Sequence, residues 1–397
     1  MGYGIIGAFF ITTACESRSW PNVSPDGSDS EYIQSAVIPL QLITETDTSD
    51  FQATPIKGAT IGWLEDAEFG HARYGFVSFP RTSNATPVIN DSTAFDSITL
   101  VLRVIGIEGN APPSQLTITV DALNESVPSD SAFSIFRTWP THQRLGQVKV
   151  NYDPQRTYIH CRLDDAFGRT LLAAYSRRDT ADNSWIKRVI NGLSIVAEGP
   201  MTSSGIPRGW VALIDLSGPS VLRIHYSDSM TLNFPLDHRT SYPQWQYIPG
   251  ESTIKKVLTG QQKVPLWMSP GATRTHLIIP SLDSLLPMPL SNMLVSQALI
   301  ELSIDTSAPQ YRSIVPPLLA ISDTMGNSIP TEGIGSLHQG RFQFSILRYF
   351  YDSLTTSRPH HLFITLPDFE QAIPARFRWV NTGNAGPRLF IKYRQKH

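Results

Sequence analysis

One order of predicted elements occurs twice along the chain, and this repeat constrains the fold more than any other feature of the sequence. In each half, a long opening strand is followed by a partner strand, a strand that runs into a short helix, another strand and a closing strand. The opening strands are predicted at 95–104 and 295–304, and the closing strands at 221–226 and 388–393. Alternation of apolar and polar residues is typical of strands with one buried face. The repeat therefore predicts two copies of one domain.

The elements between the opening and closing strands also correspond. They are partner strands at 116–123 and 317–322, strands at 158–163 and 342–346, helices at 164–175 and 347–355, and strands at 192–196 and 361–366. The composition agrees with short strands and many turns, because the chain has 30 Pro and 26 Gly and only 17% charged residues. We expect an all-β fold: two tandem jelly-roll-like β-sandwich domains with a few short helices.

The domain boundaries follow from the repeat and from the length of the chain. Its 397 residues are too many for one ordinary core. We expect an N-terminal β-sandwich domain at 36–237, a linker at 238–262 and a C-terminal β-sandwich domain at 263–397.

The N-terminus indicates export and a lipid anchor. Residues 1–14 carry no charge and end in small residues directly before Cys15. This pattern is typical of a bacterial lipoprotein signal peptide, which is cleaved so that the cysteine becomes acylated. Residues 15–35 are polar and predict a flexible, lipid-anchored tether. The alternative is a buried N-terminal strand with a chance cysteine.

The second cysteine, Cys161, is expected to be a small strand residue whose thiol does no chemistry.

A tripeptide of Asp, Ser or Thr, and then Ala, Thr or a larger apolar residue recurs along the chain. It occurs more often than its residue frequencies would supply by chance. The pattern is similar to the general O-glycosylation signal of exported Bacteroidota proteins, in which a sugar is attached to the hydroxyl residue. The alternative is turn chemistry, which Asp-Ser and Asp-Thr also favour. The candidate glycosylation sites are Ser92, Ser97, Ser131, Thr180, Ser229, Ser284, Thr324 and Ser353.

The segment 59–70 carries a family resemblance. It reads Ala-Thr-Ile-Gly-Trp-Leu-Glu-Asp-Ala-Glu-Phe-Gly, a glycine-led strand followed by a short acidic turn and Phe-Gly. Together with the segments 95–98 and 190–195 and the Tyr-ended terminal strand, it resembles a family of Bacteroidota outer-membrane lipoproteins catalogued as domain of unknown function 4270. Asn191 departs from the family pattern, in which a Lys is common before the Gly. The resemblance implies an outer-membrane lipoprotein that faces the cell surface. It implies no activity.

The acidic turn is also the densest set of potential metal ligands. Glu65, Asp66, Glu68 and His71 lie close together in sequence, and oxygen donors at this spacing could hold Ca²⁺. The alternation of Asp and Asn that is typical of calcium loops is missing, so we interpret the cluster as a structural turn and expect no metal site. A weak calcium site near Glu65–Glu68 stays open as an alternative.

Three other motifs favour structural roles. His360 and His361 are neighbours on a strand and point to opposite faces, so they cannot chelate one ion. Asp164 and Asp165 follow a strand and are expected to cap the short helix. The segment 184–187 matches Ser-x-x-Lys, but the partner motifs of that enzyme class are missing. We therefore expect no catalytic residues and no cofactor.

Aromatic residues are the remaining candidates for binding. Trp245, Tyr247 and Trp267 bracket the predicted domain junction, where loop aromatics could stack on sugars or anchor a protein partner. The net charge of −2 gives no footprint for nucleic acid. We expect a non-catalytic outer-membrane lipoprotein that docks on an outer-membrane β-barrel or on other lipoproteins. It would act as a scaffold, for instance in barrel-assembly or secretion machinery. The alternative is a surface glycan-binding lipoprotein.

Overall fold

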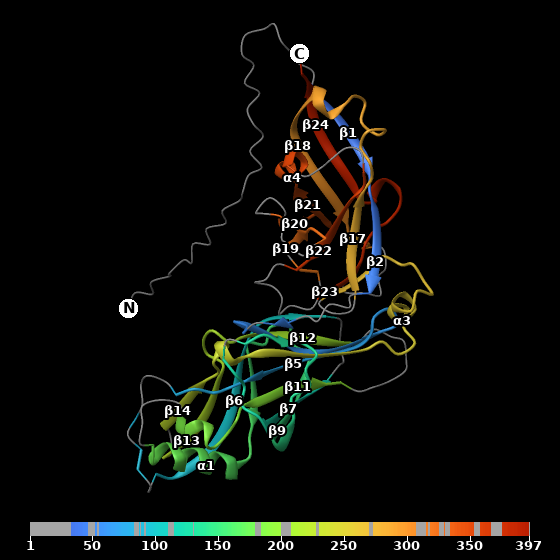
Figure 1. Ribbon diagram of the computed structural model, residues 1–397. Coiled ribbons are helices and arrows are strands. Elements are labelled where there is room, and N and C mark those ends of the chain that lie inside the picture. Colours follow the sequence, from blue (N-terminus) through green and yellow to red (C-terminus); the bar gives the residue numbers. More distant parts are fainter. Residues whose placement is uncertain are drawn as a thin grey trace, which may run out of the picture.

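The computed structural model describes the chain between residues 33 and 396. The residues that it leaves undescribed in this range are 47–51, 54, 83–86, 88, 91–92, 110–114, 130, 179–183, 200–207, 228–229, 270–272, 307–314, 317, 325–328, 330–333, 353–357 and 367–374. Two β-rich domains follow one another in space (Figure 1).

The first domain is an antiparallel β-sandwich. Its large sheet has the order β14-β13-β6-β12-β4-β5-β11-β7-β9, with β10 paired to β6 and β15 paired to β5. The sheet curls because β6 pairs with β10 and β13 through its first part and with β12 through its last. The elements are β3 (Gln52–Ala53), β4 (Gly58–Asp66), β5 (Gly70–Ser78), β6 (Phe95–Glu108), β7 (Gln115–Leu123), β8 (Phe133–Ser134), β9 (Thr141–Asn151), β10 (Tyr158–Arg162), α1 (Asp165–Ser176), α2 (Ser184–Lys187), β11 (Leu193–Glu198), β12 (Arg208–Asp215), β13 (Val221–Tyr226), β14 (Met230–Pro235), η1 (His238–Thr240) and β15 (Tyr242–Ile248).

The second domain is built in the same way. Its large sheet has the order β1-β24-β18-β21-β20-β19-β22-β17-β2, and β16 pairs with β23 beside it. A short helix, α3 (Thr253–Leu258), lies between the domains. The other elements are β1 (Gln34–Pro39), β2 (Gln41–Thr46), β16 (Leu266–Ser269), β17 (Thr273–Ile279), η2 (Leu290–Asn292), β18 (Met293–Ser303), β19 (Leu318–Ser322), β20 (Ile334–His338), β21 (Arg341–Ser345), α4 (Leu347–Asp352), β22 (His360–Thr365), β23 (Ala375–Arg378), η5 (Gly383–Ala385) and β24 (Arg388–Gln395).

The main strands and the helices α1 and α4 of the two domains correspond, as the sequence repeat predicts. The opening strand β6 lies between β10 and the closing strand β13, and β18 lies in the same way between β21 and β24. β11 lies between β5 and β7, and β22 lies between β17 and β19. The helices α1 and α4 contact the opening strands β6 and β18. The prediction that the closing strands occupy the same sheet position is confirmed.

The predicted domain boundaries are wrong at one place in particular. β1 and β2, the first described strands of the chain, pair with β24 and β17 of the second domain. In the first domain the same two edges, β13 and β5, are covered by β14 and β15. The second domain is therefore discontinuous in sequence, and the first domain is inserted between β1 and β2 and the rest of the second domain. The expected linker at 238–262 in fact contains η1, β15 and α3.

Local chemistry explains why α1 begins where it does. Asp164 has an extended backbone, and its carboxylate accepts a hydrogen bond of 2.9 Å from the backbone N–H of Phe167. This is the N-cap that the sequence predicts. A Cβ at Gly168 would lie 2.5 Å from the ring of Phe95, so a glycine allows the helix to pack closely on β6.

In the described part of the chain, no helix is long and apolar enough to span a bilayer.

The core of the second domain includes side chains from its N-terminal strands. Ile38, Leu40 and Leu42 are buried and pack with residues of β17, β18 and β24. Val37, their neighbour on β1, is 55% exposed. Because Ile38 is 2% exposed, its side chain stabilises the second domain through buried apolar area and close packing.

We predict that Ile38→Ala destabilises the second domain by about 2–4 kcal/mol, because the truncation leaves a cavity in a packed core. Val37→Ala is the matched control, and it should change stability by less than about 0.5 kcal/mol because its side chain is exposed. Urea denaturation combined with hydrogen exchange measures both. Ile38→Ala should lower the hydrogen-exchange protection of β24 and β17, which pair with β1 and β2. Equal stability of the two variants would show that β1 is not part of the core.

Candidate functional site

The acidic turn between β4 and β5 lies at the junction of the two domains. The Asp66 carboxylate accepts hydrogen bonds from the backbone N–H groups of Glu68, at 2.8 Å, and Phe69, at 2.6 Å, which fixes the turn. Its second oxygen lies 2.7 Å from the guanidinium of Arg376 on β23, and both side chains are buried. Arg378, also on β23, forms an ion pair with Glu68. Two arginines of the second domain thus neutralise two carboxylates of the first.

These contacts account for the carboxylates of Asp66 and Glu68 without a cation, and the Glu65 carboxylate lies 3.8 Å from the His71 ring. The oxygens of Asp66 are used by two backbone N–H groups and by Arg376. An arginine at this position supplies the positive charge that Ca²⁺ would bring. No group of three or more potential ligand side chains suitable for a metal ion is present among the described residues. The interpretation of the cluster as a structural turn agrees with the geometry.

A hydrophobic cluster continues the junction beyond the ion pairs. Leu64, Phe69 and Tyr74 of the first domain pack with Ile254 and Val257 of α3 and with Leu266 and Met268 of β16. The N-terminus of α3 is held on the acidic turn, because the backbone N–H of Ile254 donates to the carbonyl of Glu68 at 2.6 Å. The junction combines apolar burial with paired charges, so the two domains pack against each other over a specific contact.

Two of the three aromatic residues that the sequence suggests for binding are buried. Trp245 is 2% exposed and lies in the junction cluster, where its ring meets that of Tyr74 edge to face at 5.3 Å. Trp267 is fully buried in the core of the second domain beside Phe377 and Trp379. The expectation that these two indoles act as exposed anchors is wrong, because strand alternation turns both rings inward.

Tyr247 is half-buried at the rim of the same cluster. Its ring lies edge to face with those of Phe136, at 5.5 Å, and Tyr74, at 6.3 Å. Burial raises the pKa of Tyr247 and of Tyr74 well above the usual range for a phenol. Both phenols therefore keep their protons at neutral pH, and their contribution here is packing.

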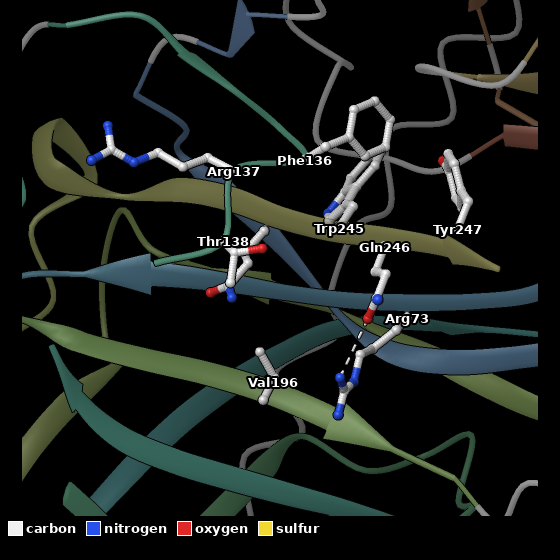
Figure 2. A pocket seen from close by; sticks show the side chains of 9 residues that line it. Arg73, Phe136, Arg137, Thr138, Val196, Trp245, Gln246 and Tyr247 are labelled. Carbon is white, nitrogen blue, oxygen red and sulfur yellow. Dashed lines mark hydrogen bonds between the residues drawn. The ribbon is translucent and has the colours of Figure 1, made fainter. Parts of the chain in front are cut away.

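A hollow of about 610 Å³ lies along the edge of β15, on the first domain (Figure 2). It is lined by Arg73, Phe136, Arg137, Thr138, Val196, Gln244, Trp245, Gln246 and Tyr247. Because side chains alternate along β15, Trp245 and Tyr247 lie on one face of the strand, and Gln244 and Gln246 lie on the other. Figure 2 shows the aromatic rings and the Gln246–Arg73 pair on opposite sides of the ribbon.

The polar side of the hollow is ordered by hydrogen bonds between neighbouring strands. Arg73 of β5 donates to the amide oxygen of Gln246 at 3.4 Å and forms an ion pair with Glu198 of β11. The hydroxyl of Ser194 donates to the amide oxygen of Gln244 at 3.0 Å. These contacts hold the side chains of Arg73, Gln244 and Gln246 in place at the surface. In the described structure, β15 pairs only with β5 and is an edge strand of the sheet.

Arg137 closes one end of the hollow. Its guanidinium lies 4.1 Å from the ring centroid of Trp139 and 4.7 Å from that of Phe133, and it forms an ion pair of 2.7 Å with Glu125. Stacking on two rings and pairing with a carboxylate restrict the side chain to one orientation.

The structure describes four of the eight candidate glycosylation sites. Ser284 and Thr324 are exposed in turns, which suits attachment of a sugar. Ser97 is half-buried within β6, and Ser131 is half-buried with its backbone N–H bonded to the Tyr242 hydroxyl. Ser92, Thr180, Ser229 and Ser353 lie outside the described residues, as does Cys15.

Cys161 lies on β10 and is 1% exposed, as expected for a small strand residue. Burial raises the pKa of its thiol to about 11, so little thiolate exists at neutral pH. The interpretation of Cys161 as a packing residue agrees with this environment.

One polar cluster could not be predicted from sequence. His276 of β17 contacts Glu45 of β2 at 2.7 Å through Nδ1 and His361 of β22 at 2.8 Å through Nε2. The three residues lie on adjacent strands that are distant in sequence. His361 is thus one member of a cross-strand chain that also ties β2 to the sheet.

No family model matches the chain, and no curated protein matches it.

We predict that Arg376→Met destabilises the protein by about 3–5 kcal/mol, because it leaves the buried Asp66 carboxylate without its cation. Arg162→Met is the matched control. It removes an ion pair with Asp165 in which both side chains are largely exposed, and the loss should stay below about 1 kcal/mol. Chemical denaturation of the two variants gives both values. A loss for Arg376→Met no larger than that of the control would mean that the junction does not depend on this pair.

Proposed function

We propose that the chain is a non-catalytic, surface-facing outer-membrane lipoprotein, and that it acts as a scaffold subunit docked on a β-barrel or on other lipoproteins. In this proposal Cys15 carries the lipid and residues 15–35 form the tether. The proposal includes membership of the Bacteroidota lipoprotein family that the segment 59–70 resembles.

The observation that carries the proposal is the place where the chain enters the fold. β1 begins at Gln34, opposite Tyr393 at the C-terminal end of the second domain. β2 ends opposite Thr273, whose hydroxyl bonds to Leu266 of β16 at the junction. The chain therefore crosses the whole second domain before it reaches the first, and Figure 1 shows the start of β1 at the end away from the first domain. A tether attached there would hold the first domain outward from the membrane.

The packing of the candidate chemical groups supports a role other than catalysis. Asp164 caps α1, and Asp165 pairs with Arg162 at 2.6 Å. The segment Ser184–Lys187 is the short helix α2, and the Lys187 ammonium lies over the ring of Phe79. Each group has a structural partner, whereas a nucleophile and its base would have to face each other.

We predict that Cys15→Ala releases the protein from the membrane into the soluble envelope fraction, because one acylated cysteine is the anchor in this proposal. Cys161→Ala is the matched control and should leave the protein in the membrane, since that thiol is buried in the first domain. Fractionation with detection of the full chain measures both variants. Membrane retention of Cys15→Ala would contradict the anchor.

The scaffold role predicts a stable contact with another envelope protein. A photo-crosslinking residue at Met230, 53% exposed on the outward domain, or at Leu294, 52% exposed near the start of β18, should give a discrete adduct in intact cells. Samples kept in the dark are the control, and pull-down after detergent extraction should recover the same partner. Recovery of the chain alone from both positions would contradict the scaffold role and favour the second candidate, a surface glycan-binding lipoprotein.

A further inference from the structure

The hollow along β15 is lined by polar and aromatic side chains that could bind a ligand, and this role is separate from the proposed docking on another envelope protein. We propose that it binds a glycan whose sugars carry acetamido or carboxylate groups.

The two glutamines present donors to the hollow. A guanidinium can only donate hydrogen bonds, so the amide oxygen of Gln246 must be the atom that faces Arg73. The NH₂ group of Gln246 then remains for a ligand, and the same holds for Gln244, whose oxygen accepts from Ser194. Neither amide nitrogen donates a hydrogen bond within the described part of the chain. Thr138, which is exposed at the same rim, adds a hydroxyl.

The charges around the hollow are balanced. Arg73 is paired with Glu198, and Arg137 is paired with Glu125. The carboxylates remove most of the net charge but leave N–H groups of both guanidiniums as donors, because each arginine has five. The hollow is therefore rich in donors and close to neutral.

A donor-rich surface selects a ligand that is rich in acceptors. A sugar hydroxyl brings a proton that needs an acceptor, and the amide oxygens of both glutamines each already accept one hydrogen bond. The carboxylate of a uronate accepts without donating, and an acetamido group adds to a sugar a carbonyl oxygen with two lone pairs beside a single N–H donor. Either group could accept from Gln246, from Arg73 or from Thr138, and unpaired donors would disfavour a glycan that lacks such an acceptor.

The size of the hollow fits a small part of a glycan. Its 610 Å³ fall within the usual range of small-molecule sites. Trp245 borders it, and the buried indole N–H of Trp245 has no acceptor among the described residues. A ligand that occupies the hollow should therefore change the fluorescence of this tryptophan.

The test is a titration of the full chain with three tetrasaccharides, followed by calorimetry and by tryptophan fluorescence. They are a β-1,4-linked N-acetylglucosamine tetramer, a galacturonate tetramer and a β-1,4-linked glucose tetramer. Saturable binding of the first or the second is expected, and which one binds identifies the acceptor group. The glucose tetramer should bind at least about tenfold more weakly, because it has neither a carboxylate nor an amide carbonyl to accept from the donors of the hollow.

Gln246→Ala and Thr138→Ala locate the site. Each should weaken binding about fivefold, the loss expected for one hydrogen bond. Gln143→Ala is the matched control, because Gln143 is an exposed glutamine on β9 of the same domain, outside the hollow, and it should bind like the parent chain. No saturable binding of either substituted tetramer would overturn the proposal. So would equal binding of the glucose tetramer, or unchanged affinity in both hollow variants.

Discussion

The closing of the second β-sheet by the first strands of the chain is the constraint on which the rest of the structure depends. β24 and β17 would be open edges without β1 and β2, and Ile38 and Leu42 would leave the core. Open strand edges and a half-empty core are both unfavourable, so the second domain reaches its final form only when both parts of it have been made. The first domain must then fit between them. Its place at the end of the second domain follows from this connectivity.

The junction shows how the insertion is stabilised. β16 turns Trp267 into the core of the second domain and presents Leu266 and Met268 to the outer face of β4 and β5. Arg376 and Arg378 from β23, the partner of β16, reach the acidic turn of the first domain. The same two-stranded element therefore completes one core and contacts the other domain. A buried charge pair adds specificity to this contact, because removal of either partner leaves an uncompensated charge.

Much of the fold follows from local sequence patterns. Alternation of apolar residues predicts the strands β6, β13, β18 and β24, and the position of Asp164 predicts the N-cap of α1. Their order predicts two domains of one kind. Local patterns do not say which sheet edge a strand joins, and β1 therefore appeared to belong to the first domain. The aromatic residues near the junction show the same limit. The sequence predicts that Trp245 and Trp267 lie in loops, but the packing of distant strands buries both side chains. The Asp66–Arg376 pair and the His276–His361 contact join distant residues, and no spacing rule reveals them.

The central claim is that the discontinuous second domain and the buried junction make the two sandwiches one cooperative unit. Differential scanning calorimetry of the full chain tests it most directly. The account predicts one unfolding transition whose calorimetric and van't Hoff enthalpies agree for the whole chain. Two separate transitions, each with the enthalpy of a single domain, would contradict the claim, because they would show that neither the shared strands nor the junction couples the domains.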